Sequence, residues 1–265
     1  MMLELRHVTK TFNRGTASEK PALTGVDLTL DDGDFVTIIG GNGAGKSTLL
    51  NMIAGVYPLD SGQVILGGVD ISMLPEHARA KYLGRVFQDP MRGTAADMEI
   101  VENLALAKRR GARRGLAWGI TREEQAEYRT ALASLDLGLE ERPTAKVGLL
   151  SGGQRQAVTL LMATLQKPRL LLLDEHTAAL DPKTAQKVLD LTQRLVDEHH
   201  LTTLMVTHNM NDALRLGNRL VMMNEGTIIY DVAGAEKERL TVADLLQKFE
   251  DVAGSEFAND RVLLS

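Results

Sequence analysis

A glycine-rich loop that directly follows a short apolar run constrains this chain more than any other feature. The loop reads Gly-Gly-Asn-Gly-Ala-Gly-Lys-Ser-Thr over residues 40–48, and the run at residues 35–39 has the character of a buried strand. Glycines at 40, 43 and 45 allow left-handed backbone conformations, so successive N–H groups can turn inward around phosphate oxygens. A strand, such a loop and a following helix predict an α/β fold that binds nucleotide phosphates.

The residues that close this loop supply the charge that a nucleoside triphosphate requires. Lys46 provides a cation for the β- and γ-phosphates, Ser47 provides a hydroxyl for Mg²⁺, and the helix that begins here directs its positive dipole end at the anion. A glycine-rich turn without a ligand is the alternative, but every fixed position of the pattern is filled. The loop residues predicted to bind nucleotide are Gly40, Asn42, Gly43, Ala44, Gly45, Lys46, Ser47 and Thr48.

Composition excludes several other classes of protein. The 265 residues suffice for one large α/β domain or two smaller ones, and the net charge of -5 argues against a general nucleic-acid binder. The absence of cysteine excludes disulfides, thiolate metal sites and thiol catalysis. Apolar runs are far shorter than the ~20 residues of a membrane helix, and residues 1–20 lack the apolar core of a signal peptide. We therefore expect a cytosolic protein that can still dock on a membrane partner.

The first third of the chain is rich in predicted strands, and a helical insert follows it. Strands are predicted at residues 3–8, 26–30, 35–39, 64–66 and 85–87. The insert spans about residues 90–165. Within it, Thr121 and Glu124 have the spacing of a capping box, and the helix that they open is expected to end at Gly138.

Two consecutive carboxylates follow four leucines at residues 170–173. Such a run is typical of a strand buried on both faces, and a helix opened at Asp181 with a strand at residues 202–206 completes βαβ units of a parallel sheet. Ligands of open parallel sheets bind at the carboxyl ends of the strands, where Asp174 and Glu175 stand. Asp174 is placed to hold Mg²⁺ through water, and Glu175 to orient or deprotonate the water that attacks the γ-phosphate. A solvated acidic turn is the alternative, which the glycine-rich loop disfavours.

Another helix N-terminus is offered by the sequence Leu-Ser-Gly-Gly-Gln at residues 150–154. Ser151 and Gln154 have capping-box spacing, so this helix also presents N–H groups to an anion. With this motif the chain, over about residues 2–250, resembles the ATP-binding cassette (ABC) ATPases. The resemblance implies that ATP and Mg²⁺ bind, and that two copies of the chain assemble head to tail. It also implies that one copy completes the nucleotide site of the other through Ser151, Gly152, Gly153 and Gln154.

The same resemblance implies the fold and the domain organisation. The fold would be α/β, a P-loop NTPase mixed sheet flanked by helices, with an N-terminal antiparallel β subdomain and a helical subdomain that carries the 150–154 motif. Residues 1–250 would form a single ABC ATPase domain, and residues 251–265 a C-terminal tail. A strand at residues 227–230 and a helix at residues 242–249 are expected to pack on the core or on the partner.

Four further positions match the family pattern in order along the chain. By resemblance, Phe12 stacks on adenine, Gln88 contacts Mg²⁺ and the γ-phosphate, His208 hydrogen-bonds the γ-phosphate, and Asp181 couples the two sites of the dimer. Ordinary roles stay open for three of them: a packing residue for Phe12, a structural histidine for His208 and a helix N-cap for Asp181. The predicted catalytic residues are Glu175, His208 and Gln88, and the predicted metal ligands are Ser47, Gln88 and, through water, Asp174.

The stretches at residues 40–46, 87–91 and 175–181 resemble, more narrowly, the ATPase subunits of a bacterial uptake group. That group has a lipoprotein-type substrate-binding protein, a permease similar to branched-chain amino acid permeases, and aromatic amino acids as proposed cargo. His176 and Gly41 stand where many family members have proline, and neither removes a catalytic group. The resemblance thus implies an ATP-hydrolysing subunit that powers import of amino acids or a related small solute. Such a subunit would bind a permease at the inner face of the membrane and, indirectly, a substrate-binding protein.

A soluble ABC ATPase that acts on nucleic acid or ribosomes is the alternative function. Members of that kind join two cassettes in one chain or carry a long coiled coil, whereas this chain has one Lys46-type loop and no sustained heptads. We therefore expect no nucleic-acid partner. The basic run at residues 108–114 is expected to be a solvated loop between helices of the insert, with contact to anionic lipid as the lesser alternative.

Overall fold

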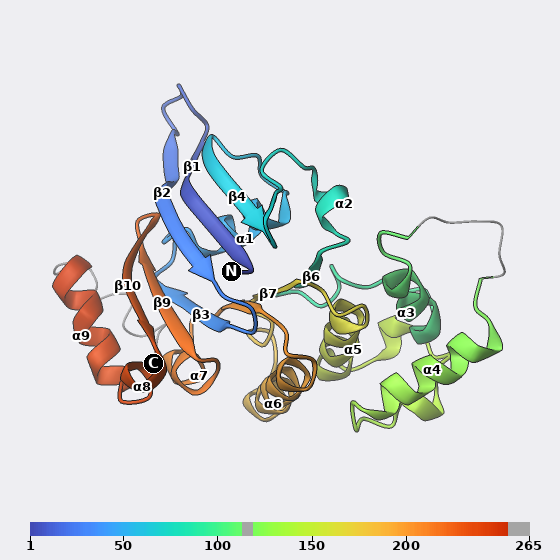
Figure 1. Cartoon of the computed structure of the whole chain (residues 1–265). Helices are drawn as coiled ribbons and strands as arrows, with labels where there is room; N and C mark the ends of the chain where they lie inside the picture. The colour runs from blue at the N-terminus through green and yellow to red at the C-terminus, as the bar shows by residue number, and fades with distance from the viewer. Residues whose placement is uncertain (113–118, 254–265) are drawn as a thin grey trace. The chain divides into compact units, whose positions relative to one another are not determined.

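Residues 1–112 and 119–253 are described by the computed structural model, and they divide into two units. Unit 1 contains Met1–Arg79 and the described chain from Leu201 on, and unit 2 contains Ala80–His200 without residues 113–118. Figure 1 labels most of the helices and strands of both units.

An antiparallel sheet is formed by the first part of unit 1. Its strands are β1 (Leu3–Phe12), β2 (Lys20–Leu30), β4 (Ser61–Leu66) and β5 (Val69–Asp70), in the order β2-β1-β4-β5. Figure 1 labels the first three of these strands, β2, β1 and β4. Leu3, Leu5 and Val8 of β1 are buried while residues between them are more exposed, because successive side chains of a strand point to opposite faces. The predicted N-terminal antiparallel subdomain is confirmed, and β1 and β2 are longer than the apolar runs that predicted them.

The remaining strands of unit 1 are mostly parallel. They lie in the order β10-β9-β3-β8, formed by β3 (Phe35–Gly40), β8 (Thr203–Val206), β9 (Arg219–Asn224) and β10 (Thr227–Ala233). β3 runs parallel to both of its neighbours, and all six of its residues are buried, as is usual for a central parallel strand. The predicted C-terminal helix is α9 (Val242–Ala253), whose Phe249 packs with Ile39 and Met222 in a buried cluster that α7 (Met210–Arg215) also joins. The strand and helix predicted after residue 225 therefore pack on the core.

Three further helices of unit 1 are short. α1 (Lys46–Ala54) follows the glycine-rich loop and ends at Gly55, whose φ of 81° is left-handed. α2 (Glu76–Arg79) and α8 (Gly234–Lys237) have four residues each.

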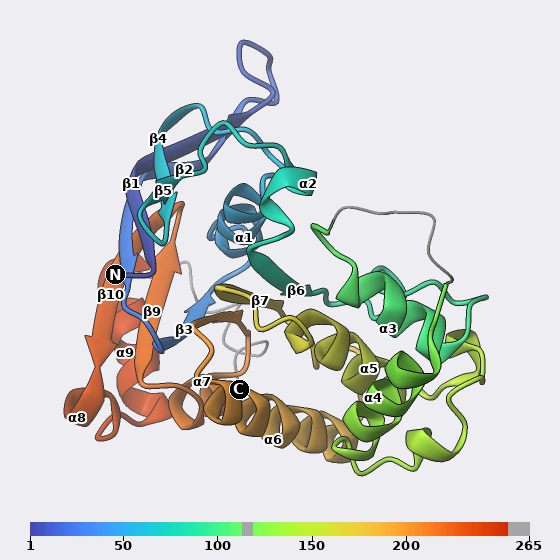
Figure 2. The ribbon, with the colours of Figure 1, turned by 45° about the vertical axis from the view of Figure 1, so that its right-hand side comes forward.

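Unit 2 contains a parallel strand pair and most of the long helices. β6 (Leu83–Val86) pairs in parallel with β7 (Leu170–Asp174), and all four leucines of β7 are fully buried. The predicted insert contains α3 (Ile100–Lys108), α4 (Arg122–Ala133) and α5 (Gly152–Thr164), with the 3₁₀ turns η1 (Leu139–Glu141) and η2 (Val147–Leu149). Helix α5 packs against α3 and against α6 (Pro182–His199), which follows β7 (Figure 2). Among the residues that the structure describes, no helix has both the length and the apolar character needed to cross a membrane.

Helix α4 ends earlier than the sequence predicts. Thr121 caps its start as expected, because the Thr121 hydroxyl accepts from the amide of Glu124 at 3.2 Å. The helix stops at Ala133 rather than at Gly138, because Leu135 bonds back to Leu132 in a tighter turn and Asp136 takes a left-handed φ of 55°. Gly138 instead precedes η1.

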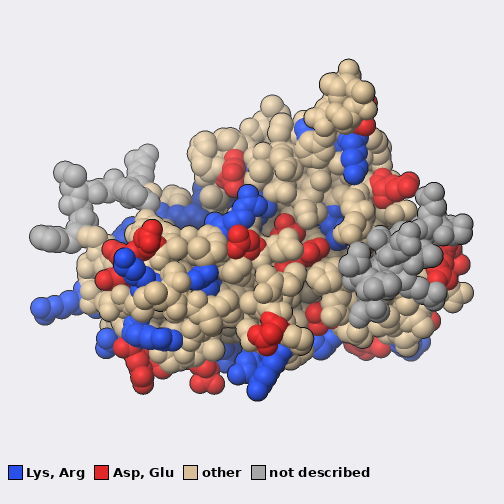
Figure 3. Space-filling model, turned by 180° about the vertical axis from the view of Figure 1, so that it is seen from behind, with Lys and Arg blue, Asp and Glu red and all other residues tan. Residues whose placement is uncertain are grey.

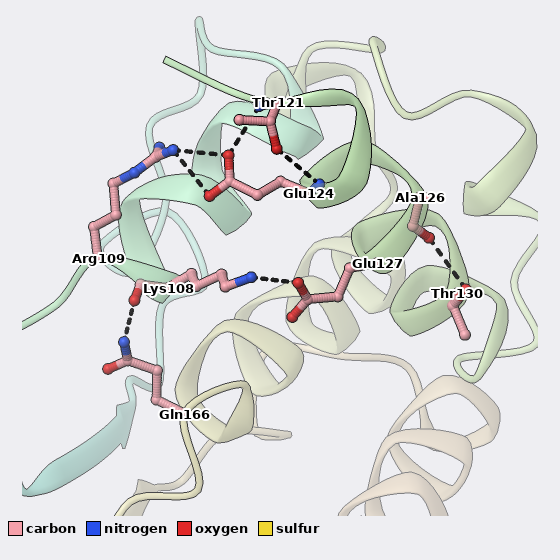
Figure 4. A network of polar contacts seen from close by, with 8 residues as sticks. All are labelled: Lys108, Arg109, Thr121, Glu124, Ala126, Glu127, Thr130 and Gln166. Carbon is pink, nitrogen blue, oxygen red and sulfur yellow. Dashed lines mark hydrogen bonds and ion pairs between the residues drawn. The ribbon is translucent and has the colours of Figure 1, made fainter. Parts of the chain in front are cut away.

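The basic run is also different from the expected solvated loop. Lys108 ends α3 and forms an ion pair with Glu127, and the Arg109 guanidinium contacts the Glu124 carboxylate at 3.0 Å (Figure 4). Arg110 donates to the carbonyl of Ala163 at 3.4 Å, and burial lowers the pKa of Arg110. These three cations therefore join helices of unit 2, so the solvated-loop interpretation is wrong for them, while contact with anionic lipid stays a prediction. Residues 113 and 114 lie outside the described residues.

Candidate functional site

The glycine-rich loop has a steric need for its glycines. A Cβ on Gly40 would lie 2.4 Å from the carbonyl oxygen of Met223, and a Cβ on Gly45 would lie 2.5 Å from that of Ala22. Gly45 is also the N-cap of α1, with a left-handed φ of 98°, and Gly43 has a φ of 81°. The loop backbone therefore adopts conformations and close contacts that a residue with a Cβ would disfavour. The glycines leave a cradle without side chains before a helix N-terminus.

Lys46 brings its charge to the same loop. The side chain is 7% exposed, and its Nζ donates to the carbonyls of Gly40 at 2.6 Å and Gly41 at 3.0 Å. The ammonium group is therefore located at the cradle and not in solvent. A cradle of backbone N–H groups, a helix N-terminus and a lysine fit the charge of a triphosphate.

Arg79 anchors the far end of the helix that starts at this loop. The residue is 1% exposed, and its guanidinium donates to the carbonyls of Met52 and Ile53, in the last turn of α1, at 2.7 and 2.9 Å. It also donates to Leu74 at 2.7 Å and to Ser72 at 2.8 Å, and burial lowers the pKa of Arg79. Sequence reasoning missed this residue, because a single arginine in a polar stretch gives no signal of burial.

Phe12 and a lysine that sequence reasoning missed lie at one end of the antiparallel sheet. Phe12 of β1 is the cross-strand partner of Lys20 in β2, and the Lys20 Nζ lies 3.6 Å from where a Cβ on Gly43 would stand. The half-buried Phe12 ring contacts Tyr57 edge-on, with centroids 5.1 Å apart. The pairing thus brings an aromatic ring and a second cation to the neighbourhood of the loop. Stacking of Phe12 on adenine stays a prediction.

His208 lies at the same edge of unit 1 as the loop. β3 and β8 are parallel with Ile38 opposite Val206, and the amide of Thr207 donates to the carbonyl of Ile38 at 3.1 Å. Extending this register by two residues brings Gly40 opposite His208, which is exposed. The prediction that His208 follows a strand is confirmed, while its contact with a γ-phosphate stays a prediction.

The carboxylates and Gln88 lie at one edge of unit 2. Val86 of β6 is opposite Leu173 of β7, so the same two-residue extension brings Gln88 opposite Glu175. Asp174 is the last residue of β7, and Glu175 has a left-handed φ of 43°. The structure therefore brings three of the predicted residues to the carboxyl ends of one parallel strand pair, where ligands of such sheets bind.

The motif at residues 150–154 opens α5 as predicted. Ser151 Oγ accepts from the amide of Gln154 at 3.3 Å, and the Gln154 side chain accepts from the amide of Ser151 at 3.2 Å. A Cβ on Gly153 would lie 2.2 Å from the Thr184 methyl group, so this position requires glycine. Ser151 and Gly152 are exposed, and Ser151, Gly153 and Gln154 line a cavity of about 530 Å³ beside α6. The motif is therefore accessible to another molecule.

The turn between β7 and α6 contains the two remaining residues that the sequence singled out. Asp181 is the N-cap of α6 and accepts from the amide of Thr184 at 3.1 Å; hydrogen bonds from the side chain and then from the backbone of Thr184 lower the pKa of Asp181. His176 is 2% exposed, its Nε2 lies 3.0 Å from the Thr192 hydroxyl, and burial lowers the pKa of His176 to about 4. The imidazole is therefore neutral at physiological pH. The capping role of Asp181 is confirmed, and its coupling role stays a prediction.

The predicted site residues thus fall into two sets. Unit 1 carries the loop at residues 40–48 with Phe12 and His208, and unit 2 carries Gln88, the 150–154 motif and the two carboxylates. Within the described residues, no group of three or more histidine, aspartate and glutamate side chains could hold a metal ion by itself.

A protein-family model and several transport ATP-binding proteins are similar to this chain over more than half of its length. The family model for the ABC transporter matches residues 23–178. The tyrosine transport ATP-binding protein of Clostridioides difficile is 44% identical over 249 residues, which cover 94% of this chain and 99% of that protein. The methionine import ATP-binding protein MetN 2 of Enterococcus faecalis is 36% identical over 86% of this chain and 64% of that protein.

Solved structures agree with this similarity. A dimeric post-hydrolysis state of the ATP-binding cassette MJ0796 bound to ADP and Pi has a TM-score of 0.74 at 31% identity, over 88% of this chain and 98% of that chain. The ADP conformation of MJ1267, an ATP-binding cassette of an ABC transporter, has a TM-score of 0.77 at 28% identity, over 94% of this chain and 98% of that chain. The predicted cassette fold is confirmed, and the chain belongs to the ABC transporter family as one of its ATP-binding and ATP-hydrolysing subunits.

Proposed function

We propose that this ATPase subunit hydrolyses Mg-ATP to power a bacterial importer of amino acids or a related small solute. The observation that carries the proposal is the glycine cradle with Lys46, which provides a steric and electrostatic fit to phosphates. Gln88, Asp174 and Glu175, gathered at one edge of a parallel strand pair, support it.

Each set of residues has its part in binding and hydrolysis. The backbone and side chains from Gly40 to Thr48 bind the phosphates, and Phe12 stacks on adenine. Ser47, Gln88 and, through water, Asp174 hold Mg²⁺, because hydroxyl, amide and carboxylate oxygens suit this hard cation; Mg²⁺ neutralises phosphate charge. Glu175 orients or deprotonates the attacking water, while Gln88 and His208 hydrogen-bond the γ-phosphate.

Two copies of the chain would form the working ATPase. The exposed Ser151 and Gly152 and the neighbouring cavity leave the 150–154 motif accessible, so that it can cap the nucleotide of a second copy in a head-to-tail dimer. The dimeric structure of MJ0796 with ADP and Pi supports this arrangement.

The relatives support amino acid import. The similarity to a tyrosine transport ATP-binding protein covers 94% of this chain, and the methionine import relative carries another amino acid in its name. We infer an aromatic amino acid as cargo, a permease as direct partner and a substrate-binding protein as indirect partner, with the subunit on the cytoplasmic face of the membrane. Action on nucleic acid is disfavoured, because lysine and arginine are interspersed with acidic residues on the face shown in Figure 3.

Two substitutions test the catalytic assignment. Lys46→Ala should raise the Kd for ATP, because the phosphate cation is lost, and an unchanged Kd would contradict the role of the loop. Glu175→Gln should retain ATP binding while hydrolysis falls about 10²-fold or more, because the cradle remains and the water-orienting group is lost. The variant should also accumulate as an ATP-bound dimer in size-exclusion chromatography. Lys183→Ala, an exposed residue outside the predicted site, is the matched control.

A separate experiment tests transport and cargo. Affinity capture from detergent-solubilised membranes should recover a polytopic permease, and recovery of ribosomes or DNA in its place would refute the transporter assignment. Uptake of radiolabelled tyrosine should then fall in cells that carry Glu175→Gln, with an unrelated sugar as the control solute.

A further inference from the structure

The backbone of Glu175 is held in an uncommon conformation. Its φ of 43° lies in the left-handed region, where the Cβ of a residue with a side chain comes too close to the backbone. The turn continues as the amide of Ala178 donates to the carbonyl of Glu175 at 3.0 Å. Such a conformation persists only where neighbouring groups hold it.

His176, the next residue, connects this turn to the middle of helix α6. It is 2% exposed, and its Nε2 lies 3.0 Å from the hydroxyl of Thr192, which is fully buried. The Thr192 hydroxyl donates its proton to the carbonyl of Val188 at 2.8 Å. Because a hydroxyl has one proton, Thr192 accepts from His176, and the network assigns the proton of the neutral imidazole to Nε2.

Helix α6 is a firm support for such a contact. It has 18 residues, is capped by Asp181 with Pro182 at its first turn, and buries Val188, Leu191, Thr192 and Leu195 along one face. The turn after β7 is therefore fastened at the strand, at the helix cap and, through His176, at a residue three turns into the helix.

We propose that His176 is a positioning residue for Glu175, whose left-handed turn it fixes through the hydrogen bond to Thr192. The inference rests on the proposed role of Glu175 in hydrolysis. Displacing a catalytic group by about 1 Å can cost up to about 10² in rate, so loss of one support should lower kcat about tenfold. The KM for ATP should stay unchanged, because the phosphate loop belongs to unit 1.

Two pairs of substitutions separate the hydrogen bond from the volume of the side chains. His176→Leu and Thr192→Val both remove the bond, and valine keeps the shape of threonine. His176→Gln places an amide donor near the position of Nε2, and Thr192→Ser keeps the hydroxyl, so both should retain kcat within about twofold. ATP hydrolysis is measured with the full chain in its active assembly. Single-turnover rates are measured as well, so that the chemical step is separated from product release. If His176→Leu does not fold, Thr192→Val carries the test.

The decisive measurement repeats these substitutions in a Glu175→Gln background. A residue that acts through Glu175 should have no further effect once that carboxylate is gone, whereas a merely structural role would lower the rate by the same factor in both backgrounds. Wild-type kcat in both His176→Leu and Thr192→Val would overturn the inference, as would an equal loss in the Glu175→Gln background. A wild-type rate for Glu175→Gln alone would instead refute the catalytic assignment on which the inference rests.

Discussion

Replacing Arg79 by methionine should destabilise unit 1 strongly, although this residue touches no part of the predicted nucleotide site. Methionine approximates the length of the arginine stem but donates no hydrogen bonds. The substitution therefore removes four contacts to the carbonyls of Met52, Ile53, Ser72 and Leu74, all between 2.7 and 2.9 Å.

The expected loss follows from what happens to these carbonyls. Met52 keeps a second donor, the amide of Gly55 at 3.1 Å, so three carbonyls lose the donor that Arg79 supplies. A buried acceptor left without its partner costs about 1–3 kcal/mol. Removing a buried charge returns part of this, because burial disfavours the charged guanidinium. Three unpaired carbonyls at the lower end of this range cost about 3 kcal/mol together, and we expect the free energy of unfolding to fall by about that amount.

Urea unfolding followed by circular dichroism measures this change, and hydrogen exchange of the α1 amides assigns it to the correct helix. Arg14→Met is the matched control in the same unit, because the Arg14 side chain is 67% exposed and its ion pair with Asp60 is worth at most about 1 kcal/mol. The reasoning would be refuted if the free energy of unfolding of Arg79→Met lay within about 0.5 kcal/mol of the wild-type value, half of the smallest cost of one unpaired buried acceptor. It would also be refuted if the α1 amides kept their protection from hydrogen exchange while amides elsewhere lost theirs.

Three further predictions concern the loop, the 150–154 motif and acid stability. Gly45→Ala should abolish ATP binding and lower the free energy of unfolding by more than about 2 kcal/mol, because its Cβ would lie 2.5 Å from a backbone carbonyl oxygen. Gly33→Ala is the control: this position has a φ of 83° and open space around it, so the same unfolding assay should show a loss of only about 1 kcal/mol. Gly153→Ala should lower kcat, and adding Thr184→Ala should restore it, because the clash at 2.2 Å is with the threonine methyl group; no rescue would locate the cause elsewhere. His176 has a pKa of about 4 when folded and 6.5 in the unfolded chain, so the unfolded chain binds more protons between these values and stability falls as the pH falls through that window. Relative to pH 7.5, its contribution at pH 5 should be about 2 kcal/mol lower, and His176→Leu should remove this part of the pH dependence.

Features that depend on neighbouring residues were predictable from the sequence. Thr121, Ser151 and Asp181 each cap a helix as expected, because a cap is a hydrogen bond between groups three residues apart. The glycine-rich loop was identified for a similar reason, since its pattern records the backbone conformations that the loop needs. For these elements the local sequence contains most of the physical information.

Features that depend on burial were not predictable. Arg79 and Lys20 gave no signal, because the partners that define their positions come from distant parts of the chain. His176 was noticed only as a departure from a common residue, and its contact with Thr192 became visible once α6 was placed. Lys108 and Arg109 were misread as solvated, because their acidic partners lie on a different helix, α4.

The register of the parallel strands explains why the two halves of the candidate site resemble each other. The sequence indicated that His208 and Glu175 follow strands, but it could not indicate which residue lies opposite each of them. The structure aligns Ile38 with Val206 and Val86 with Leu173, and in both pairs the site residues stand two positions farther on. Because β3 and β7 are buried on both faces, an alternation of polar and apolar residues does not hold their register, and the fit of their side chains to the packed core holds it instead. The apolar core thus determines where the polar residues meet, and a substitution that loosens this packing should impair the site without touching it.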